Sequence, residues 1–397
     1  APSVSAANAF TFSANSPFID LMGITPDNIK LENLRWEKTT SANLGVDLSL
    51  FQGRLTAVGD VSFMKTKDLI LDMPLSMTSG FESMMRNFGT MRGRVFEASF
   101  TGMPLKTNKW NLTLSLNISR SMNKVIELPD HQPVVRENVL DNGKFMSLVN
   151  EGDQVGTIYG LRNLGVFSRD EDAYAKDENG NFITDFSGER VPIRWGKYDG
   201  EEFKGGDVIY DDINKDGIID KQDVVAIGNN TPDFFGGFMF RLKYNNTWEL
   251  FANFTYQYGF DIINMAKMNT INMYTNNNQS QAVMRRWRKQ GDMTDIPRAL
   301  YGAGHNWVGN DYFVEDGSYI KFNSLTLAYN FQKRVLKKLG LRSAKIALTA
   351  YNLGILTKYS GVDPSISANR NDPFSLGQDR ALTPVPITYT LGFWVNF

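Results

Sequence analysis

The sequence predicts an all-β chain, an antiparallel transmembrane β-barrel with about nine strands and long extracellular loops. Three observations predict this fold class. Apolar and polar residues alternate with period two, short and long connections alternate between the runs, and aromatic residues gather near the ends of the runs. A soluble β-sandwich also alternates, so the loop lengths and the aromatic positions separate the two architectures.

The alternation is clearest at 110–119, where every apolar residue is followed by a polar one. We expect Leu112, Leu114, Leu116 and Ile118 to face lipid, and Thr113, Ser115 and Asn117 to face the lumen. Similar runs lie at 44–50, 55–63, 96–100, 234–244, 248–258, 325–331, 346–350 and 389–397. A strand of about ten residues rises about 33 Å, and at a tilt near 45° it spans about 23 Å, close to the apolar band of such barrels.

The connections between these runs are short and long in turn, which is typical of an outer-membrane barrel. The short connections are 52–54, 103–109, 245–247 and 332–343. The long connections are 71–90, 120–233, 259–312 and 354–386. Within the last short connection, "KRVLKKLG" predicts one or two helical turns that end at Gly340.

Tyr and Trp residues near the strand ends would form the two interfacial girdles of a barrel, the alternative being packing in a protein core. These residues are Trp36, Trp110, Tyr244, Trp248 and Tyr258. We therefore divide the chain into an extracellular segment (1–33), barrel strands (34–119), a large extracellular loop (120–233) and carboxy-terminal barrel strands (234–397). An odd number of strands leaves open edges, so we expect this chain not to close into a barrel alone.

Composition excludes several classes of function. The 397 residues carry a net charge of -1, so no basic field points to nucleic acid. There is no cysteine for thiolate metal sites, and two histidines, His131 and His305, leave little for a zinc centre or a catalytic triad. No apolar run approaches the about 20 residues of a membrane helix, and the first residues lack the pattern of a signal peptide. We expect no catalytic residues.

The segment "DINKDGIIDKQD" at 212–223 has the ligand spacing of a calcium loop. Gly217 occupies the position of the sharp turn, and the last position is Asp instead of the usual bidentate Glu, which predicts modest affinity. The glycine and β-branched residues on both sides exclude an EF-hand helix pair. A surface turn that binds nothing is the alternative to a structural calcium site. The expected donors are Asp212, Asn214, Asp216, the Ile218 carbonyl, Asp220 and Asp223.

Two other motifs carry less information. The basic segment "RRWRK" at 285–289 could meet an anionic substrate, although a solvent-facing external loop explains it as well. Glu315 and Asp316 are adjacent, and neighbours on a strand point to opposite faces, so they cannot flank one glycosidic bond.

Seven blocks of the chain, in order, resemble the SusC/RagA-like TonB-dependent outer-membrane transporters of Bacteroidota. They are "NLRWEKTTSANLGVDLSLFQGRLT", "MKTKDLILDMPL", "EGDQVGTIYGLRNLGVF", "GDVIYDDINKDGIIDKQDVVAIGNNTPDFFGGF", "DIPRA", "FVEDGSYIKFNSLTLAYNF" and "YNLGILTKYSGVDPS". Two blocks depart from the family's pattern, with "NNTPDF" where "NPxPDF" is common and "YNLGIL" where "NLLTF" is frequent.

The resemblance implies the carboxy-terminal part of a 22-stranded barrel in the outer membrane of a Gram-negative, Bacteroidota-type bacterium. It also implies a SusD-like surface lipoprotein as a lid, a plug-bearing amino-terminal part that contacts TonB, and active import of oligosaccharides or peptides. The 212–223 segment would lie in an external loop near the lid, and the final "TLGFWVNF" resembles an aromatic barrel-assembly signal. Substrate-binding residues remain unknown from sequence.

Two other classes of function stay open at this point. An outer-membrane adhesin, structural barrel or passive porin would sit in lipid without a lid or plug. A soluble carbohydrate-binding β-protein would bury its apolar faces in a core. The partners expected of an importer are the lipoprotein lid, the plug-bearing part, TonB, membrane lipid and the substrate, without nucleic acid.

Overall fold

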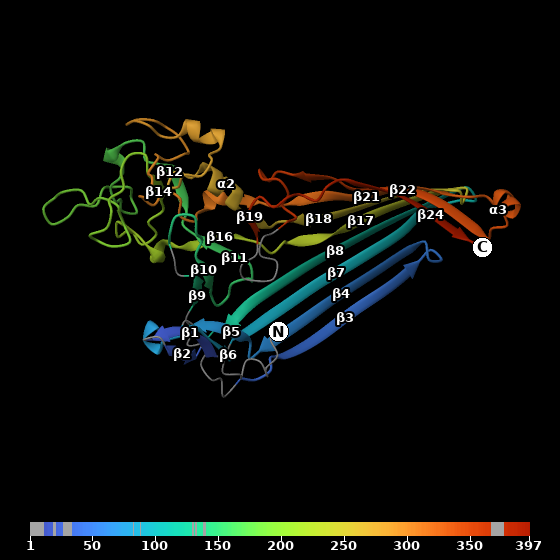
Figure 1. The fold of residues 1–397 in the computed structure, drawn as a ribbon, viewed down its shortest axis with the longest axis horizontal. Coiled ribbons are helices and arrows are strands. Elements are labelled where there is room, and N and C mark those ends of the chain that lie inside the picture. Colours follow the sequence, from blue (N-terminus) through green and yellow to red (C-terminus); the bar gives the residue numbers. More distant parts are fainter. Residues whose placement is uncertain are drawn as a thin grey trace.

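The computed structural model describes residues 12–18, 21–26, 34–81, 83–87, 89–128, 131, 133–137, 140–366 and 377–397. It consists of one large antiparallel sheet and a layer of long loops at one end of the strands (Figure 1). Within these residues no helix is both long and apolar enough to cross a membrane.

The large sheet has nine strands in the described part of the chain, and each is antiparallel to its neighbours. Their spatial order follows their order in the chain, as expected of an up-and-down barrel. All nine predicted runs are strands, and two have the predicted bounds, β17 (Phe234–Tyr244) and β18 (Trp248–Tyr258). The others are β3 (Lys38–Leu50), β4 (Leu55–Lys67), β7 (Thr90–Lys106), β8 (Trp110–Glu127), β21 (Tyr319–Asn330), β22 (Ser343–Thr357) and β24 (Thr388–Asn396).

Some predicted boundaries were wrong. Strand β8 continues to Glu127, beyond the predicted end at residue 119, so the long loop that follows does not begin at 120. Strand β7 likewise extends to Lys106, which shortens the predicted connection 103–109. The end of β8 is polar and lacks the alternating apolar positions, but its backbone pairs with β7 as far as Thr90 and Glu127. Backbone pairing thus extends the hairpin where side chains give no signal.

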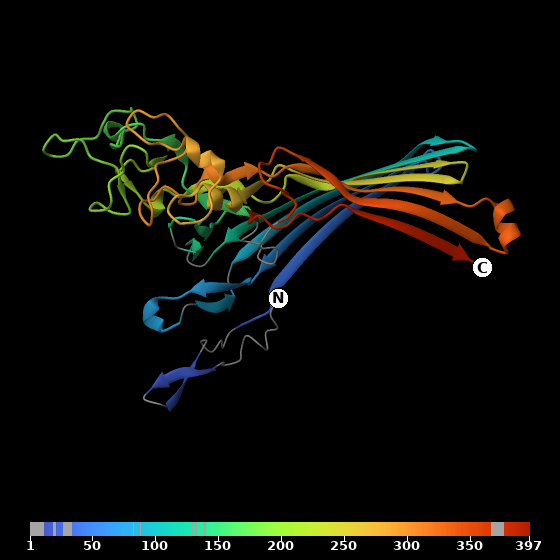
Figure 2. The ribbon, with the colours of Figure 1, turned by 45° about the horizontal axis from the view of Figure 1, so that its top comes forward.

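The pairing register places the alternating residues in lateral rows. One row consists only of leucines and crosses seven strands: Leu105, Leu112, Leu242, Leu250, Leu327, Leu348 and Leu391. The residues adjacent in sequence to these leucines form a second row on the opposite face. This row is mostly polar: Thr113, Arg241, Phe251, Thr326, Thr349 and Thr390. The sheet is curved and twisted (Figure 2), with one apolar and one mostly polar face.

An aromatic row lies near the short connections. Trp110 pairs with Tyr244, which pairs with Trp248, and Trp248 pairs with Tyr329. The ring centroids of Trp110 and Tyr244 are 4.5 Å apart, and those of Trp248 and Tyr329 are 4.8 Å apart. Three of the predicted girdle residues therefore share one level of the sheet. Trp36 precedes β3, and Tyr258 ends β18 at the opposite, loop-bearing end.

The short connections contain the predicted helical turn. Helix α3 spans Lys333–Leu339 between β21 and β22. It ends at Gly340, whose φ of 68° lies in the left-handed region that a residue without a Cβ adopts at little cost. This confirms the predicted helix and its stop.

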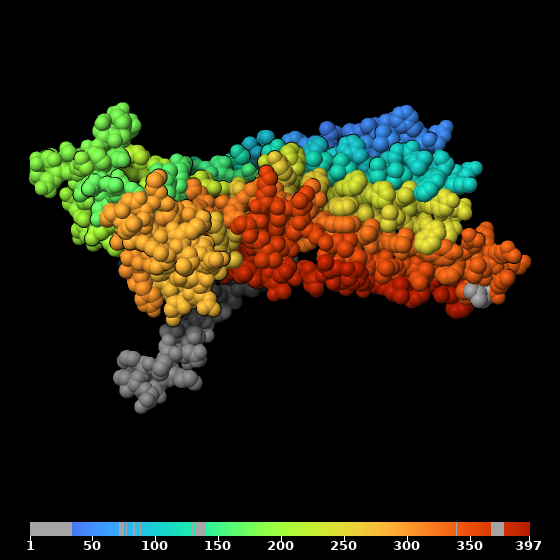
Figure 3. Space-filling model, turned by 90° about the horizontal axis from the view of Figure 1, so that it is seen from above, coloured from blue at the N-terminus to red at the C-terminus, as the bar shows by residue number. Residues whose placement is uncertain are grey.

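The loop layer holds most of the buried apolar side chains. One cluster surrounds Met268, Trp307 and Phe313, and a second surrounds Leu161 and Ile219. Figure 3 shows the loops, in green and orange, gathered beyond one end of the strands. The long loops contain these short strands and one helix: β5 (Ile70–Pro74), β6 (Ser83–Asn87), β9 (Val134–Glu137), β10 (Ser147–Val149), β11 (Thr157–Gly160), β12 (Asn163–Val166), β13 (Arg194–Trp195), β14 (Val208–Tyr210), β15 (Ile218–Ile219), β16 (Val225–Asn229), β19 (Asp261–Asn264), α2 (Met265–Ile271), β20 (Val314–Asp316) and β23 (Gln378–Asp379).

The expected extracellular segment 1–33 is described only in part. Its strands β1 (Phe12–Phe18) and β2 (Leu21–Pro26) form an antiparallel hairpin. The rest of 1–33 lies outside the described residues.

Candidate functional site

The predicted calcium loop, 212–223, lies in the long connection between β8 and β17. Strands β14 and β16 flank it, so the prediction that no helix pair frames the loop is confirmed. The loop itself contains the short strand β15 and a single turn of 3-10 helix, Lys221–Asp223.

Side chains of the loop accept hydrogen bonds from its own backbone and so give it a compact shape. The amide of Gly217 donates to Oδ2 of Asp212 at 2.8 Å, and the amide of Ile218 donates to Oδ1 of Asp216 at 2.8 Å. Gly217 has a φ of 80°, as the sharp turn at this position requires. The sequence pattern therefore produces the expected local fold.

Two of the expected donors are buried carboxylates. Asp223 is completely buried, and its two oxygens accept from the amides of Ile213 and Asp220, each at 2.8 Å. Burial raises the pKa of Asp223 to about 6, against the lowering effect of these hydrogen bonds. Asp212 is 7% exposed, and burial also raises its pKa. Its Oδ1 is buried without a hydrogen-bond partner in the described structure.

The other expected donors point less directly inward. Asp216 is exposed and accepts from Nδ2 of Asn214 at 2.9 Å, while Oδ1 of Asp220 accepts from the amide of Gln222 at 2.7 Å. Among the described residues, no three His, Cys, Asp or Glu side chains are gathered in a way that could hold a metal ion. The loop thus brings Asp212 and Asp223 into its interior but leaves Asp216 and Asp220 nearer the surface.

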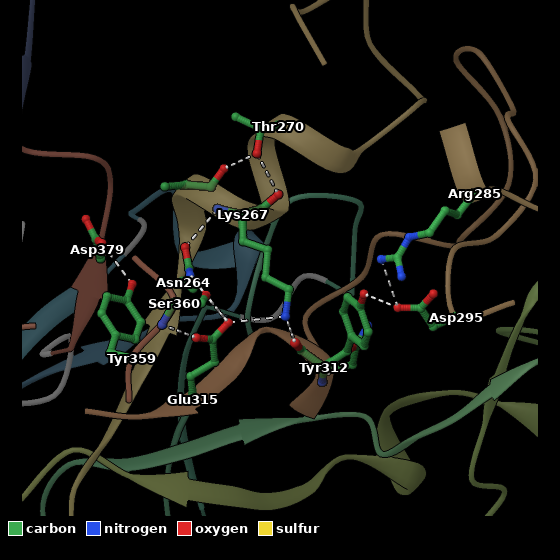
Figure 4. Close-up of polar contacts among 12 residues, drawn as sticks. Asn264, Lys267, Thr270, Arg285, Asp295, Tyr312, Glu315, Tyr359, Ser360 and Asp379 are labelled. Atoms are coloured by element: carbon green, nitrogen blue, oxygen red, sulfur yellow. Dashed lines mark hydrogen bonds and ion pairs between the residues drawn. The ribbon is translucent and has the colours of Figure 1, made fainter. Parts of the chain in front are cut away.

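The structure also contains a polar network that the sequence did not predict, centred on Glu315 (Figure 4). Nζ of Lys267 lies 3.2 Å from Oε1 of Glu315 and donates to the carbonyl of Tyr312 at 2.9 Å. Ser360 donates to the same carboxylate through its amide at 3.0 Å and its hydroxyl at 2.9 Å. The network joins β20, α2 and the connection after β22.

Electrostatics favour an ionised Glu315. Burial raises its pKa, but the hydrogen bonds from Ser360 and the positive charge of Lys267 outweigh this effect, and the net pKa is lowered. Nearby, the hydroxyl of Tyr359 donates to Oδ2 of Asp379 at 2.8 Å, and β19 pairs in parallel with β23. These contacts tie the last long loop to the preceding one. No sequence motif marks them, because their members lie far apart in the chain.

The adjacent Glu315 and Asp316 do not act as a carboxylate pair. Glu315 serves the network above, whereas Oδ1 of Asp316 accepts from the amide of Ser318 at 2.8 Å. The structure therefore agrees with the expectation that they do not flank one bond.

The basic segment 285–289 is held by local contacts. Arg285 lies 3.7 Å from Asp295, and Arg288 donates to the carbonyl of Met284 at 2.9 Å. Nε1 of Trp287 donates to the carbonyl of Ser168 at 3.1 Å, which ties this segment to the 168–207 region. These contacts favour a structural role over anion binding.

The two histidines also have structural contacts. The ring of His305 stacks on Trp195, with centroids 4.3 Å apart and planes 9° apart, and its Nε2 lies 3.4 Å from Glu201. Burial lowers the pKa of His305, which favours the neutral ring. His131 lies 3.0 Å from Oε1 of Glu151. Both histidines thus contact other side chains of the long loops.

A groove of about 720 Å³ opens near the loop-bearing end of the sheet. Its lining includes Ile118, Tyr256, Ile320 and Leu356. These residues lie in one lateral row of the sheet, in which Gly236 pairs with both Ile118 and Tyr256, and Ile320 pairs with both Tyr256 and Leu356. That row belongs to the apolar face, because Ile118 and Leu112 are separated by an even number of positions on one strand. The groove is thus lined in part by the face that the sequence assigns to lipid, and also by residues of the strand ends such as Gln257 and Thr357.

The chain has curated relatives among the TonB-dependent receptors, although it matches no protein-family model. It is 30% identical to a TonB-dependent receptor of Formosa agariphila over 94% of this chain, and 25% identical to the TonB-dependent receptor SusC of Bacteroides thetaiotaomicron over 92%. The chain spans 37% and 32% of these relatives, respectively. Both relatives are receptors by name.

Solved structures have the same fold. The chain superposes on the RagAB peptide importer in its closed-closed and open-open states with a TM-score of 0.72 in both. Sequence identity is 20%, and the match covers 98% of this chain but 39% and 38% of the solved chains. In sequence the chain thus resembles TonB-dependent receptors, SusC among them, and its nine-stranded sheet has the fold of part of the RagAB structures.

Proposed function

We propose that the chain is part of an outer-membrane importer that uses TonB to take up oligosaccharides or peptides. The observation that carries this proposal is the 30% identity with a TonB-dependent receptor over 94% of the chain. The solved structures that share its fold are of a peptide importer, which supports the peptide alternative, while the relationship to SusC leaves oligosaccharides open. The membrane would be the outer membrane of a Bacteroidota-type bacterium.

The importer would work with a SusD-like surface lipoprotein as a lid and with a plug-bearing part that contacts TonB. The loop layer supports such a partner, because several large apolar side chains on its surface are strongly exposed. Large apolar side chains that lie together on a surface mark protein contacts, so these residues are candidates for such a contact. The most exposed are Tyr198, Phe186, Met284, Met293 and Tyr301.

The alternatives differ from import in what they require. A soluble carbohydrate-binding protein would bury the apolar face of its sheet, yet Leu44, Phe63, Leu327, Leu348 and Leu391 are each about half exposed or more. This argues for contact with lipid or with further barrel strands. A passive porin or an adhesin would share the exposed face but would not need TonB.

Uptake measurements in the native bacterium test the proposal. We would delete the receptor gene that contains this chain and measure uptake of labelled oligosaccharide and peptide mixtures, with and without a protonophore. Import predicts that uptake of one class is lost in the deletion strain and that the protonophore abolishes it in the parent. Uptake that survives the protonophore would indicate a porin, and unchanged uptake of both classes in the deletion strain would contradict import. The intact masses of proteins that co-purify in detergent would test the lid and the plug.

A further inference from the structure

The interior of the 212–223 loop contains a carboxylate oxygen with no partner. Asp212 is 7% exposed, and its Oδ1 has no hydrogen-bond donor among the described residues. An unpaired buried acceptor that carries charge costs free energy, because it has lost water without replacing it. Such an atom is stabilised by a cation.

Backbone amides of the loop hold both buried carboxylates, Asp212 and Asp223, in place. Both oxygens of Asp223 accept backbone amides, and the amide of Gly217 holds the other oxygen of Asp212. The loop therefore positions two carboxylates before any ion binds. Preorganised ligands lower the ordering cost of binding.

The backbone carbonyl of Ile218 is a third candidate ligand beside the two buried carboxylates. The carbonyls of Gly217 and Ile219 accept amides of Arg194 and Gly196, each at 2.9 Å, on the side of β13. Successive carbonyls of an extended chain point in opposite directions, so the Ile218 carbonyl points away from β13. This is the position from which a calcium loop supplies its backbone ligand.

We propose that 212–223 binds one Ca²⁺, and that the bound ion fixes the projecting segment 174–193. The two buried carboxylates and the Ile218 carbonyl form the base of the site. Asn214, Asp216 and Asp220 complete it by turning inward, which their exposed or half-buried positions permit. All donors are oxygens, and a flexible loop with six of them suits calcium better than the small, strictly octahedral Mg²⁺.

The loop is coupled to 174–193 by direct packing. A Cβ placed on Gly217 would lie 3.2 Å from Cβ of Ala175 and 3.3 Å from Cγ1 of Val191, so the turn of the loop lies directly against this segment. Ile219 is buried in the same cluster as Ala175 and Ile193. If the 212–223 loop moves, segment 174–193 therefore loses the surface against which it packs.

The segment itself has few other supports. Outside its base it is held mainly by contacts within itself. These are isolated bridges between Lys176 and Phe182 and between Thr184 and Arg190, and backbone hydrogen bonds such as those between Asp177 and Asn181 and between Asp185 and Glu189. The guanidinium of Arg190 lies 4.1 Å from the ring centroid of Phe182, and Phe186 at the far turn is fully exposed. With little buried area of its own, the segment should depend on the loop beneath it for order.

Hydrogen exchange on the detergent-purified receptor tests this proposal with calcium alone as the probe. After treatment with a chelator, we would add CaCl₂ or MgCl₂, measure binding by calorimetry, and follow exchange of peptides from 174–193. We expect one calcium site in this chain and at least tenfold slower exchange in 174–193, with no such effect of magnesium. Both D212N and D223N should abolish these changes. D211N should retain them, because it removes a neighbouring charge that pairs with Arg162 and Lys215, neither of which is an expected calcium donor.

Exchange of β22 (Ser343–Thr357) serves as a folding control, because this barrel strand is remote from the loop in sequence and should not respond in any variant. Calcium binding that persists in both D212N and D223N would place the ion elsewhere and overturn the site. Binding that leaves the exchange of 174–193 unchanged would overturn the coupling. Transport is not measured, so these results are independent of the import proposal.

Discussion

At the scale of single residues, the two faces of β8 make opposite predictions for the same substitution. Leu114 lies on the leucine-bearing face, about 9 Å above the level of Trp110 along a tilted strand, which places it near the middle of the apolar band. Ser115 lies on the opposite face, where its hydroxyl is 3.0 Å from that of Thr101. We expect L114K to lower the free energy of unfolding in lipid bilayers by about 2 to 4 kcal/mol, and S115K to lower it far less. Equal losses for the two variants, measured by denaturant titration, would contradict the assignment of faces.

At the scale of elements, the sequence was most informative where side chains alternate between two environments. The nine strands were predicted because each has apolar residues at every second position, whereas the end of β8 at 120–127 was missed because backbone pairing alone extends it. The calcium-type loop could be predicted because its donors lie within twelve residues. The Glu315 network could not, since Lys267, Glu315 and Ser360 meet only after three separate segments have folded.

The same network gives a prediction for the last long loop. Removing the charge in E315Q weakens the contacts to Lys267 and Ser360, so we expect faster hydrogen exchange in 358–366 while β21 remains protected. The folded-state pKa of Glu315 is lowered, so its contribution is complete above the ordinary Glu pKa of about 4.3 and is lost as pH falls through the lower folded value. Exchange at pH 7 should therefore distinguish the variant from the parent. K267M breaks the same ion pair from its other side and should have the same effect. Parental exchange in both variants would contradict a bracing role.

At the scale of the whole molecule, the described sheet has two open edges. Strand β3 has thirteen residues and pairs only with β4 among the described strands, and β24 has nine and pairs only with β22. Every residue of β3 is exposed in the chain alone. In hydrocarbon each unpaired backbone group costs several kcal/mol, so two such edges would cost tens of kcal/mol, more than the 5 to 15 kcal/mol that stabilises a typical domain. Further strands must therefore pair with both edges in the membrane.

We predict accordingly that β3 and β24 do not pair with each other in the native barrel. The chain has no cysteine, so disulfide formation between introduced pairs reports strand proximity directly. Cysteines at Thr326 and Thr349, whose hydroxyls are 2.9 Å apart on neighbouring strands, should crosslink in isolated outer membranes and so provide the positive control. Pairs that combine N43C with T388C or T390C should not crosslink, because strands of the remaining barrel separate the two edges. A crosslink between β3 and β24 as efficient as the control would show that nine strands close on themselves, and a small independent porin would then explain the fold better than part of a larger importer.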